Sequence, residues 1–257
     1  MAFRLRWSRQ SPRTAVAIRC IGHTPEVDQL ADDLRHAFPD APILYISDQR
    51  SRARKWPAGR DVLPITRKKL DDLGLFHARE NVGWKCGDYC YYVALEREWE
   101  YLWLVEPDVA FVNGASDILV KADTSTADLI GTRIGQRNPS WPWAERLAKA
   151  SDFAEIRAVF FPLTRVSRRL AVSLLEARRV ISARLAADDT LRVPNDESVV
   201  ATVALESGAS TLDLKAEHPE VFDLWTWGVK FWRPDVEAQG RPLIAHPVYS
   251  REEFVER

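Results

Sequence analysis

The segment Tyr101–Val112, YLWLVEPDVAFV, constrains the fold of this chain more than any other stretch. Its aromatic, β-branched and leucine residues favour a buried strand, and one acidic pair, Glu106 and Asp108, interrupts it. Because residues two apart in a strand point to the same side, both carboxylates could face one hard divalent cation that itself holds phosphate oxygens. The alternative is an acidic exit from a strand into a loop, which is common in α/β proteins.

Strand and helix signals alternate before this segment. Residues 14–20 and 42–48 have the composition of buried strands, and Thr24 followed by Pro25 marks the start of a helix between them. This order predicts a βαβ unit with a parallel pair of strands and a right-handed crossover. A further helix, expected from Gly83 onward, leads into the acidic segment.

The second half of the chain has a mixed pattern. Residues 128–134 and 156–163 predict strands, residues 166–185 predict a long amphipathic helix, and Asn195 is a helix N-cap. Together with the first half, this order predicts an α/β fold: one sandwich over residues 1–257 with a mixed, mainly parallel central sheet. A chain of 257 residues with 46% hydrophobic residues can bury such a core.

The charge distribution limits the classes of partner. A formal net charge of −1 gives no general basis for nucleic-acid binding. Arginines gather in residues 4–13 and 165–184, which predicts either solvated basic surfaces or a peripheral contact with a membrane surface.

The cysteines and the apolar runs indicate a compartment. Cys20, Cys86 and Cys90 lack the paired spacing of a metal site, so they are predicted to be buried thiols in a reducing environment. The uninterrupted apolar runs are too short to cross a bilayer. We therefore expect a cytoplasmic protein.

The helix from Gly83, the hydrophobic strand and the acid-x-acid pair together resemble the metal and sugar-nucleotide site of GT-A glycosyltransferases, with Glu-Pro-Asp where many members carry Asp-x-Asp. The resemblance covers most of the chain as architecture and only short patches as residues. It implies a Rossmann-type α/β/α sandwich in which residues 14–112 bind the nucleotide sugar and residues 113–257 bind the acceptor. The implied activity is transfer of a sugar from a UDP- or GDP-linked donor to a glycan or lipid-linked acceptor, as in polysaccharide biosynthesis.

The resemblance also implies a metal cofactor, Mn²⁺ or Mg²⁺. Glu106 and Asp108 would hold the ion, and His246, in the late segment IAHPVYS, would complete its ligands. The alternative for His246 is a structural role, because a lone histidine is more often a satisfied structural residue than a ligand.

Three further residues are candidates for contact with the donor. Asp48 follows the second predicted strand, where it could accept a hydrogen bond from the base or the ribose. Lys85 and Asp88 precede the acidic segment, as nucleotide-contacting residues do in the family. They could instead form an ordinary i,i+3 ion pair on a helix surface.

The second half supplies candidates for the catalytic base and the acceptor site. Asp196 and Glu197 follow the N-cap, where the family often holds the base that removes the acceptor's proton. Acids in a first helical turn also stabilise the helix dipole without any catalytic role. Trp225 and Trp227 could stack on a sugar ring, with core packing as the alternative.

Two other functions remain open. Sugar-nucleotide nucleotidyltransferases share the same core, but they usually carry a glycine-rich, basic loop after the first strand, where this chain has CIGHTPE. A non-catalytic nucleotide- or glycan-binding protein on a degenerate transferase scaffold is the second. The residues do not identify the donor base, the sugar, the acceptor or the stereochemical outcome.

Overall fold

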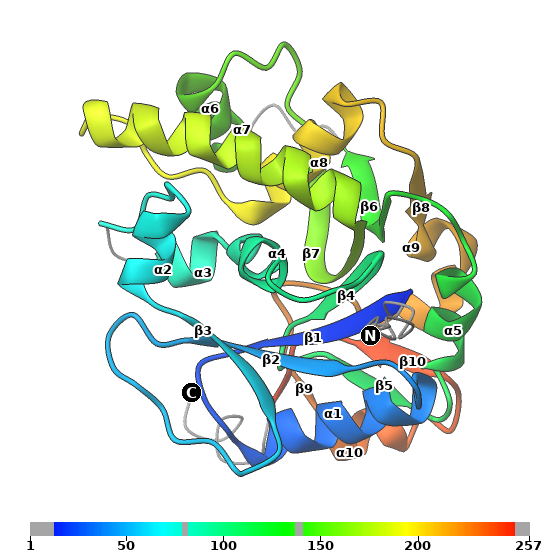
Figure 1. Cartoon of the computed structure of the whole chain (residues 1–257). Coiled ribbons are helices and arrows are strands. Elements are labelled where there is room, and N and C mark those ends of the chain that lie inside the picture. Colours follow the sequence, from blue (N-terminus) through cyan, green and yellow to red (C-terminus); the bar gives the residue numbers. More distant parts are fainter. Residues whose placement is uncertain (1–12, 79–81, 137–140, 250–257) are drawn as a thin grey trace, which may run out of the picture.

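A seven-stranded sheet runs through the centre of the molecule (Figure 1). The computed structural model describes residues 13–78, 82–136 and 141–249 of the chain. The strand order in the sheet is β3-β2-β1-β4-β7-β6-β8. The strands are β1 (Thr14–Cys20), β2 (Ile43–Asp48), β3 (Asp61–Ile65), β4 (Tyr101–Val105), β6 (Leu129–Gln136), β7 (Ala158–Ser167) and β8 (Thr211–Asp213).

Strand direction confirms the predicted mixed, mainly parallel sheet. β1 is parallel to β2 and to β4, and β2 is parallel to β3. β7 is antiparallel to both of its neighbours, β4 and β6, whereas β8 is parallel to β6. The carboxyl ends of β1, β2 and β4 therefore meet at one edge of the sheet, which is where ligands bind in open α/β sheets.

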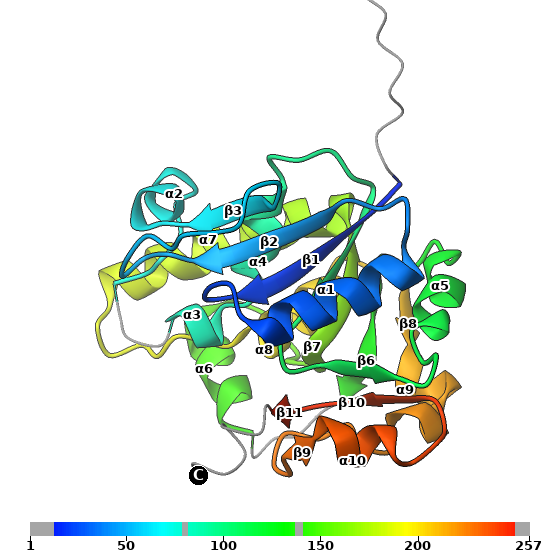
Figure 2. The same ribbon diagram turned by 90° about the horizontal axis from the view of Figure 1, so that it is seen from below.

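Helices cover both faces of the sheet, as an α/β/α sandwich requires (Figures 1 and 2). Alternate residues of each strand serve the two faces: in β4, Leu102 and Leu104 join one core, and Trp103 and Val105 join the other. The first core contains residues of α4 and α7, and the second contains residues of α1 and α5. The helices are α1 (Pro25–Ala37), α2 (Arg67–Asp72), α3 (Val82–Lys85), α4 (Tyr89–Ala94), α5 (Asp117–Asp123), α6 (Pro142–Ala150), α7 (Arg168–Ala187), α8 (Asp196–Glu206), α9 (Leu214–Glu217) and α10 (Arg233–Glu237), with a 3₁₀ turn at Pro219–Phe222.

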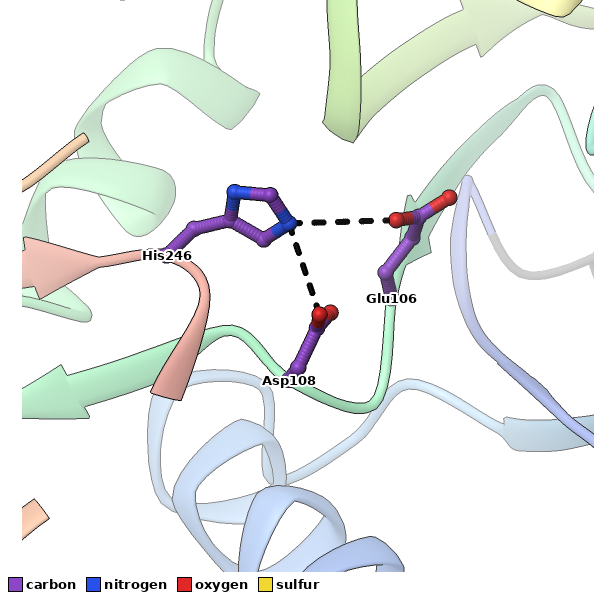
Figure 3. A group of neighbouring side chains, drawn as sticks. All are labelled: Glu106, Asp108 and His246. Atoms are coloured by element: carbon purple, nitrogen blue, oxygen red, sulfur yellow. Dashed lines mark ion pairs between the residues drawn. The ribbon is translucent and has the colours of Figure 1, made fainter. Parts of the chain in front are cut away.

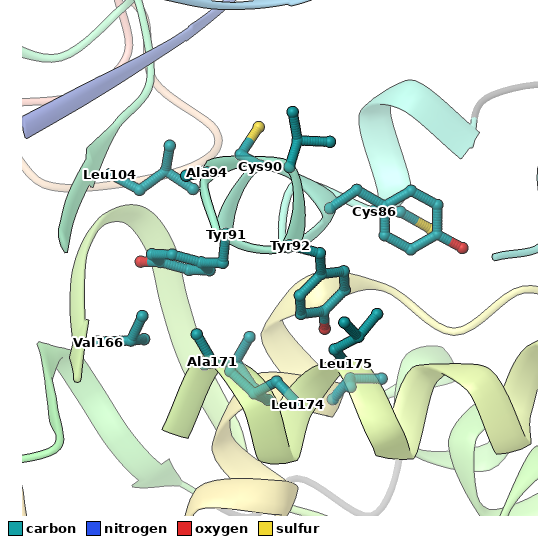
Figure 4. Close-up of a cluster of buried hydrophobic side chains, with 14 of the residues drawn as sticks. Cys86, Cys90, Tyr91, Tyr92, Ala94, Leu104, Val166, Ala171, Leu174 and Leu175 are labelled. Carbon is teal, nitrogen blue, oxygen red and sulfur yellow. The ribbon is translucent and has the colours of Figure 1, made fainter. Parts of the chain in front are cut away.

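The packing of α4 on α7 closes the first core (Figure 4). Tyr91 and Tyr92 of α4 are fully buried, and they lie over Ala171, Leu174 and Leu175 of α7. α4 has only six residues, so its position depends on this packing more than on intrinsic helix propensity.

Two small sheets lie beyond the central one. β5 (Ala110–Val112) pairs antiparallel with β10 (Leu243–Ala245), and β9 (Phe231–Trp232) pairs parallel with β11 (Val248–Tyr249). The pairing of β5 with β10 brings the end of the described chain back to the turn that follows β4.

The sequence predicted one strand through the acidic segment, and the structure has two separate strands there. β4 ends at Val105, residues 106–109 form a turn, and β5 then joins a different sheet. Pro107 has no backbone N–H and a fixed φ, so the ladder cannot continue through it. Glu106 and Asp108 consequently lie in a turn and not on one side of a strand.

The helix expected from Gly83 is also interrupted. α3 ends at Lys85 and α4 begins at Tyr89, with residues 86–88 between them. A Cβ atom at Gly87 would lie 2.3 Å from Nη1 of Arg19, so this segment packs against the end of the Arg19 side chain with no room for a side chain of its own. The break between the two helices coincides with this tertiary contact.

The basic segment 165–184 is only partly solvated. Arg165 and Arg178 are 0% and 1% exposed, and both are held by hydrogen bonds to other parts of the chain. The expectation of a solvated basic surface is therefore wrong for these two arginines. Of the other basic segment, residues 4–12 lie outside the described residues.

The three cysteines are free and buried, as predicted. Burial raises the pKa of the Cys20 and Cys86 thiols to about 12. Within the described residues, no helix combines the length and the apolar character that a bilayer crossing demands.

Candidate functional site

Three side chains from distant parts of the chain meet beside the carboxyl end of β4 (Figure 3). Glu106 and Asp108 come from the turn between β4 and β5, and His246 directly follows β10. Nε2 of His246 lies 3.6 Å from Oδ2 of Asp108 and 4.0 Å from Oε2 of Glu106. One nitrogen or oxygen ligand atom from each residue lies within 4.8 Å of the other two. This is the separation that a single bound cation could span.

The orientation of His246 follows from its backbone contacts. Nδ1 lies 2.8 Å from the carbonyl oxygen of Thr226, which can only accept, so Nδ1 carries the proton. In the neutral ring, the lone pair of Nε2 then points toward the two carboxylates. A lone pair facing carboxylate oxygens is repelled unless a proton or a metal ion lies between them, and metal-binding histidines commonly donate their other N–H to a carbonyl.

Asp108 carries the clearest sign of a missing partner. Its Oδ1 is buried and has no hydrogen bond within the described part of the chain. Burial raises the pKa of Asp108 to about 6, and Glu106 adds to the shift while His246 opposes it. A buried carboxylate oxygen without a partner is costly. Two carboxylates and one imidazole nitrogen fit a divalent cation at this point.

Arg19, at the end of β1, joins this cluster to a second acidic group. Nη1 of Arg19 forms an ion pair with Oε1 of Glu106 and lies 3.4 Å from Oδ2 of Asp196. Nη2 donates a hydrogen bond to the carbonyl oxygen of Trp84 at 2.7 Å. One half-buried cation is therefore shared between the candidate metal site and the start of α8.

Asp196 and Glu197 differ in environment although they are adjacent. Asp196 is buried, Oδ2 accepts from the amide of Gly87 at 2.8 Å, and Oδ1 accepts from the amide of Glu197 at 2.8 Å. Burial raises the pKa of Asp196 well above its usual range, although Arg19 opposes the shift. Glu197 is half-buried, and burial raises its pKa to about 7 against the opposing hydrogen bond from Asn195. Glu197 therefore titrates near neutral pH.

Asp48 lies at the same edge of the sheet, as expected, and is held by Arg50. Nη2 and Nε of Arg50 donate to the two carboxylate oxygens at 2.7 and 2.9 Å. Burial raises the pKa of Asp48, but the hydrogen bonds from Arg50 outweigh it, and the net shift is downward. The pair presents a carboxylate and a guanidinium beside the end of β2.

Lys85 and Asp88 do not form the surface ion pair considered as their alternative role. Asp88 is fully buried, and Arg178 donates to its two oxygens at 2.6 and 2.9 Å. The ammonium of Lys85 lies 5.9 Å from the ring centre of Trp143, and burial, followed by nearby Arg146, lowers its pKa. Asp88 is thus a buried residue that ties the segment between α3 and α4 to Arg178 of α7. Lys85, at the end of α3, is only half-buried.

Trp225 and Trp227 have different surroundings. Trp225 is 1% exposed, donates to Oγ1 of Thr132 at 2.8 Å and packs 5.3 Å from the ring of His246. Trp227 is 74% exposed, and the guanidinium of Arg133 lies 5.2 Å from its ring centre. Trp225 supports His246 from within the core, which leaves Trp227 as the member of the pair that is open to a ligand.

Sequence reasoning missed Arg19 and Gly87. The signal for Arg19 was a lone cation near the end of the apolar segment TAVAIRC, at the edge of the sheet where sites form. Gly87 had no local signal, because its role depends on contacts with Arg19 and Asp196 from other parts of the chain.

Comparisons with known proteins bear on the fold. No family model matches the chain, and no curated protein matches it. Among solved structures, it resembles the galactosyltransferase LgtC in complex with donor and acceptor sugar analogues, at 9% identity and a TM-score of 0.44, covering 89% of this chain and 78% of that one.

Two further structures were found. One is core-mannan synthase A from Aspergillus fumigatus in its Mn/GDP form, at 12% identity and a TM-score of 0.44, with 77% and 71% of the chains covered. The other is described as a glucose-1-phosphate thymidylyltransferase from Bacillus anthracis, at 9% identity and 0.41, with 78% and 86% covered. The TM-scores of these matches lie below 0.5 and the identities below 15%, so the function has to be argued from the residues of the chain itself.

Proposed function

We propose that this protein is a glycosyltransferase that moves a sugar from a nucleotide-diphosphate donor to a glycan or lipid-linked acceptor with the help of a divalent metal ion. The observation that carries the proposal is the convergence of Glu106, Asp108 and His246 at the carboxyl end of β4, with an orphaned oxygen on Asp108. The resemblance of this motif to the GT-A site supports the same assignment.

The three residues would hold Mn²⁺ or Mg²⁺. A bound divalent cation would neutralise charge on the leaving diphosphate as the glycosidic bond breaks. Arg19 neutralises Glu106 on the side of Asp196 and holds the start of α8 beside the metal site. His246 is kept in the correct tautomer by the carbonyl of Thr226.

Glu197 is the preferred candidate for the base. A base must reach the acceptor hydroxyl and be ionised at the working pH. Glu197 is partly exposed and has a pKa of about 7, whereas both oxygens of Asp196 accept hydrogen bonds inside the protein. Asp196 would then position the helix start. The reaction is inverting if Glu197 acts in this way.

The remaining contacts divide between donor and acceptor. Asp48 and Lys85 lie toward the ends of β1 and β2, where the donor's nucleoside would bind, and Asp88 would support this region from behind through Arg178. Trp227, exposed beside Arg133, would stack on the acceptor. This division follows the proposed donor half, residues 14–112, and acceptor half, residues 113–257.

Isothermal titration tests the proposal with UDP and GDP, each with and without Mn²⁺ or Mg²⁺. We expect one nucleotide to bind only with metal, and Asp108→Asn to weaken that binding at least about tenfold, because removing one charged ligand costs more than about 1.4 kcal/mol. The melting temperature without metal should hardly change, since the substitution keeps the shape of the side chain and removes a charge whose Oδ1 has no hydrogen bond in the described part of the chain.

Asp117→Asn, on the exposed start of α5, is the matched control and should leave nucleotide binding unchanged. If UDP or GDP binds equally well to Asp108→Asn and without metal, the metal role is wrong. If neither nucleotide binds at millimolar concentration under any condition, the transferase assignment is wrong.

A further inference from the structure

A pair of tryptophans lies next to the candidate site, on the surface formed by α3 and α6. The ring centres of Trp84 and Trp143 are 5.9 Å apart, with an angle of 58° between the ring planes. Trp84 is 67% exposed and Trp143 is half-buried. A tryptophan this exposed buries little apolar area, so its presence here is not explained by the core.

Positive charges surround this pair. The guanidinium of Arg146 lies 4.3 Å from the ring centre of Trp143, and the ammonium of Lys85 lies 5.9 Å from the same ring centre. Arg146 and Arg192 both lower the pKa of Lys85 by repulsion, after the larger effect of burial. The ammonium of Lys85 therefore lies in the field of two further cations.

The described acidic side chains neutralise these cations only in part: Arg146 lies close enough to Glu145 to help lower the pKa of that carboxyl, after the larger effect of Lys149. Many arginines among the described residues are paired with a carboxylate, whereas Lys85, Arg146 and Arg192 have no ion pair to any described residue. Glu145, adjacent to Arg146, is paired with Lys149. Among the described residues of this surface, positive charge exceeds negative charge, and such an excess favours binding of an anion.

The surface is joined directly to the candidate site. The carbonyl oxygen of Trp84 accepts a hydrogen bond from Arg19 at 2.7 Å, and Arg19 also contacts Glu106 and Asp196. The backbone of Trp84 thus contacts the residue that links the proposed metal site to the start of α8. The surface itself contains none of the metal ligands and neither candidate base.

We infer that Trp84, Trp143, Arg146 and Arg192 form a binding surface for an anionic saccharide, one whose sugar rings carry carboxylate or phosphate groups. The flat indole of Trp84 can stack on the C–H face of a pyranose ring. The two guanidiniums can bind carboxylate or phosphate oxygens with two parallel hydrogen bonds each. A neutral saccharide would satisfy the aromatic rings and leave the cations unpaired.

The inference rests on the proposed function in calling the saccharide an acceptor, and it adds the chemical class of that acceptor. It also extends the acceptor site to Trp84, which lies in the half of the chain otherwise assigned to the donor. Binding of the saccharide requires neither donor nor metal. A failure of the transferase proposal would appear in the titrations with UDP and GDP, and a failure of this inference would appear in saccharide binding alone.

Isothermal titration tests it on the full chain without nucleotide or metal. The probes are tetragalacturonate, its methyl ester as the matched neutral saccharide, and a mannose-6-phosphate-terminated oligosaccharide as the phosphate-bearing form. We expect one of the charged probes to bind and the methyl ester to bind at least about tenfold more weakly. Trp84→Ala should raise the Kd of the charged probe about fivefold.

Arg146→Gln combined with Arg192→Gln should raise that Kd by about five- to tenfold and flatten its dependence on salt concentration. Two control variants accompany these changes. Trp84→Phe keeps a flat ring and should retain most of the affinity. Arg67→Gln combined with Lys121→Gln removes the same charge from exposed positions on α2 and α5, and it should leave the Kd unchanged.

Three outcomes would overturn the inference. The first is that neither charged probe binds at millimolar concentration. The second is equal binding of the methyl ester, or binding that the two surface variants leave unchanged. The third is that vesicles with anionic phospholipid, and not the saccharides, bind in a manner that Trp84→Ala and the double arginine variant abolish, because the surface would then contact a membrane.

Discussion

The backbone amide of Gly87 donates a hydrogen bond of 2.8 Å to Oδ2 of Asp196. This bond joins the break between α3 and α4 to the first residue of α8, across more than a hundred positions of the chain. Arg19 approaches the same oxygen from β1 at 3.4 Å. The candidate base pair is therefore positioned by two elements that the sequence places far from it.

Gly87→Ala should damage this junction. The added Cβ would lie 2.3 Å from Nη1 of Arg19, 2.6 Å from Oδ2 of Asp196 and 2.7 Å from the ring of Phe161. Overpacking of this kind costs about 1–3 kcal/mol. We expect a lower free energy of unfolding, measured by urea denaturation, and a loss of transfer. Gly228→Ala, with no atom within 4 Å of the new Cβ, is the control and should unfold like the wild type.

Glu197→Gln should abolish transfer and retain binding of UDP or GDP. In the wild type, the rate should fall as pH drops below about 7, because the base becomes protonated. A pH–rate profile of the wild type with no change between pH 5 and pH 8 would rule out Glu197 as the base. Retained activity in the variant would rule it out equally.

Glu197→Gln should also change the free energy of unfolding, by an amount that depends on pH. The pKa of Glu197 is raised in the folded protein, from 4.5 to about 7, so the folded state binds more protons than the unfolded state between these values. Stability from this group is therefore lost as pH rises through that window. Glu197→Gln should be more stabilising at pH 8 than at pH 5, by about 1–3 kcal/mol, measured by urea denaturation at both pH values. Equal effects at the two pH values would contradict the raised pKa.

Arg178→Met should strongly lower the free energy of unfolding and the melting temperature. Arg178 is 1% exposed, holds both oxygens of Asp88 and donates to the carbonyl oxygen of Pro194 at 3.1 Å. Removing one partner of a buried ion pair leaves a charge uncompensated and costs about 3–5 kcal/mol. Arg179→Met, at the exposed neighbouring position, should change the melting temperature by far less. Equal effects of the two variants would show that Asp88 does not depend on Arg178.

Trp225→Ala should reduce the stability of the protein, whereas Trp227→Ala should weaken only the binding of the acceptor. Trp225 is buried against His246, so its loss should cost about 3–5 kcal/mol of stability in urea denaturation. Trp227 is 74% exposed, so its loss should leave folding and nucleotide affinity unchanged and raise the acceptor KM about fivefold. A large stability loss for Trp227→Ala would assign it to the core instead.

Much of the fold could be predicted because its signals are local. The helix start at Thr24 and Pro25 and the N-cap at Asn195 are as expected, and each cap bonds to a backbone amide three residues ahead. Strand composition placed β1, β2 and β6 correctly to within a residue or two. These features depend on residues that are neighbours along the chain, so a single sequence is enough to indicate them.

The candidate metal residues were also indicated by the sequence, although the reason given for Glu106 and Asp108 was wrong. Strand alternation was expected to align their carboxylates, whereas Pro107 ends the strand and the turn brings them together. The residue types alone thus pointed to oxygen and nitrogen ligands for a cation. Their meeting with His246 depends on the pairing of β5 with β10.

The sequence by itself determined the order of strands and helices, the helix caps and the set of acids and the histidine available for a metal site. Only the tertiary structure decided that Arg19 bridges Glu106 and Asp196, that Asp88 is buried against Arg178, and that Trp225 is covered while Trp227 is open. The physical reason is that caps and periodicity are set by bonds within a few residues. Burial and ion pairing, in contrast, depend on which distant segments the closed sheet and its covering helices bring into contact.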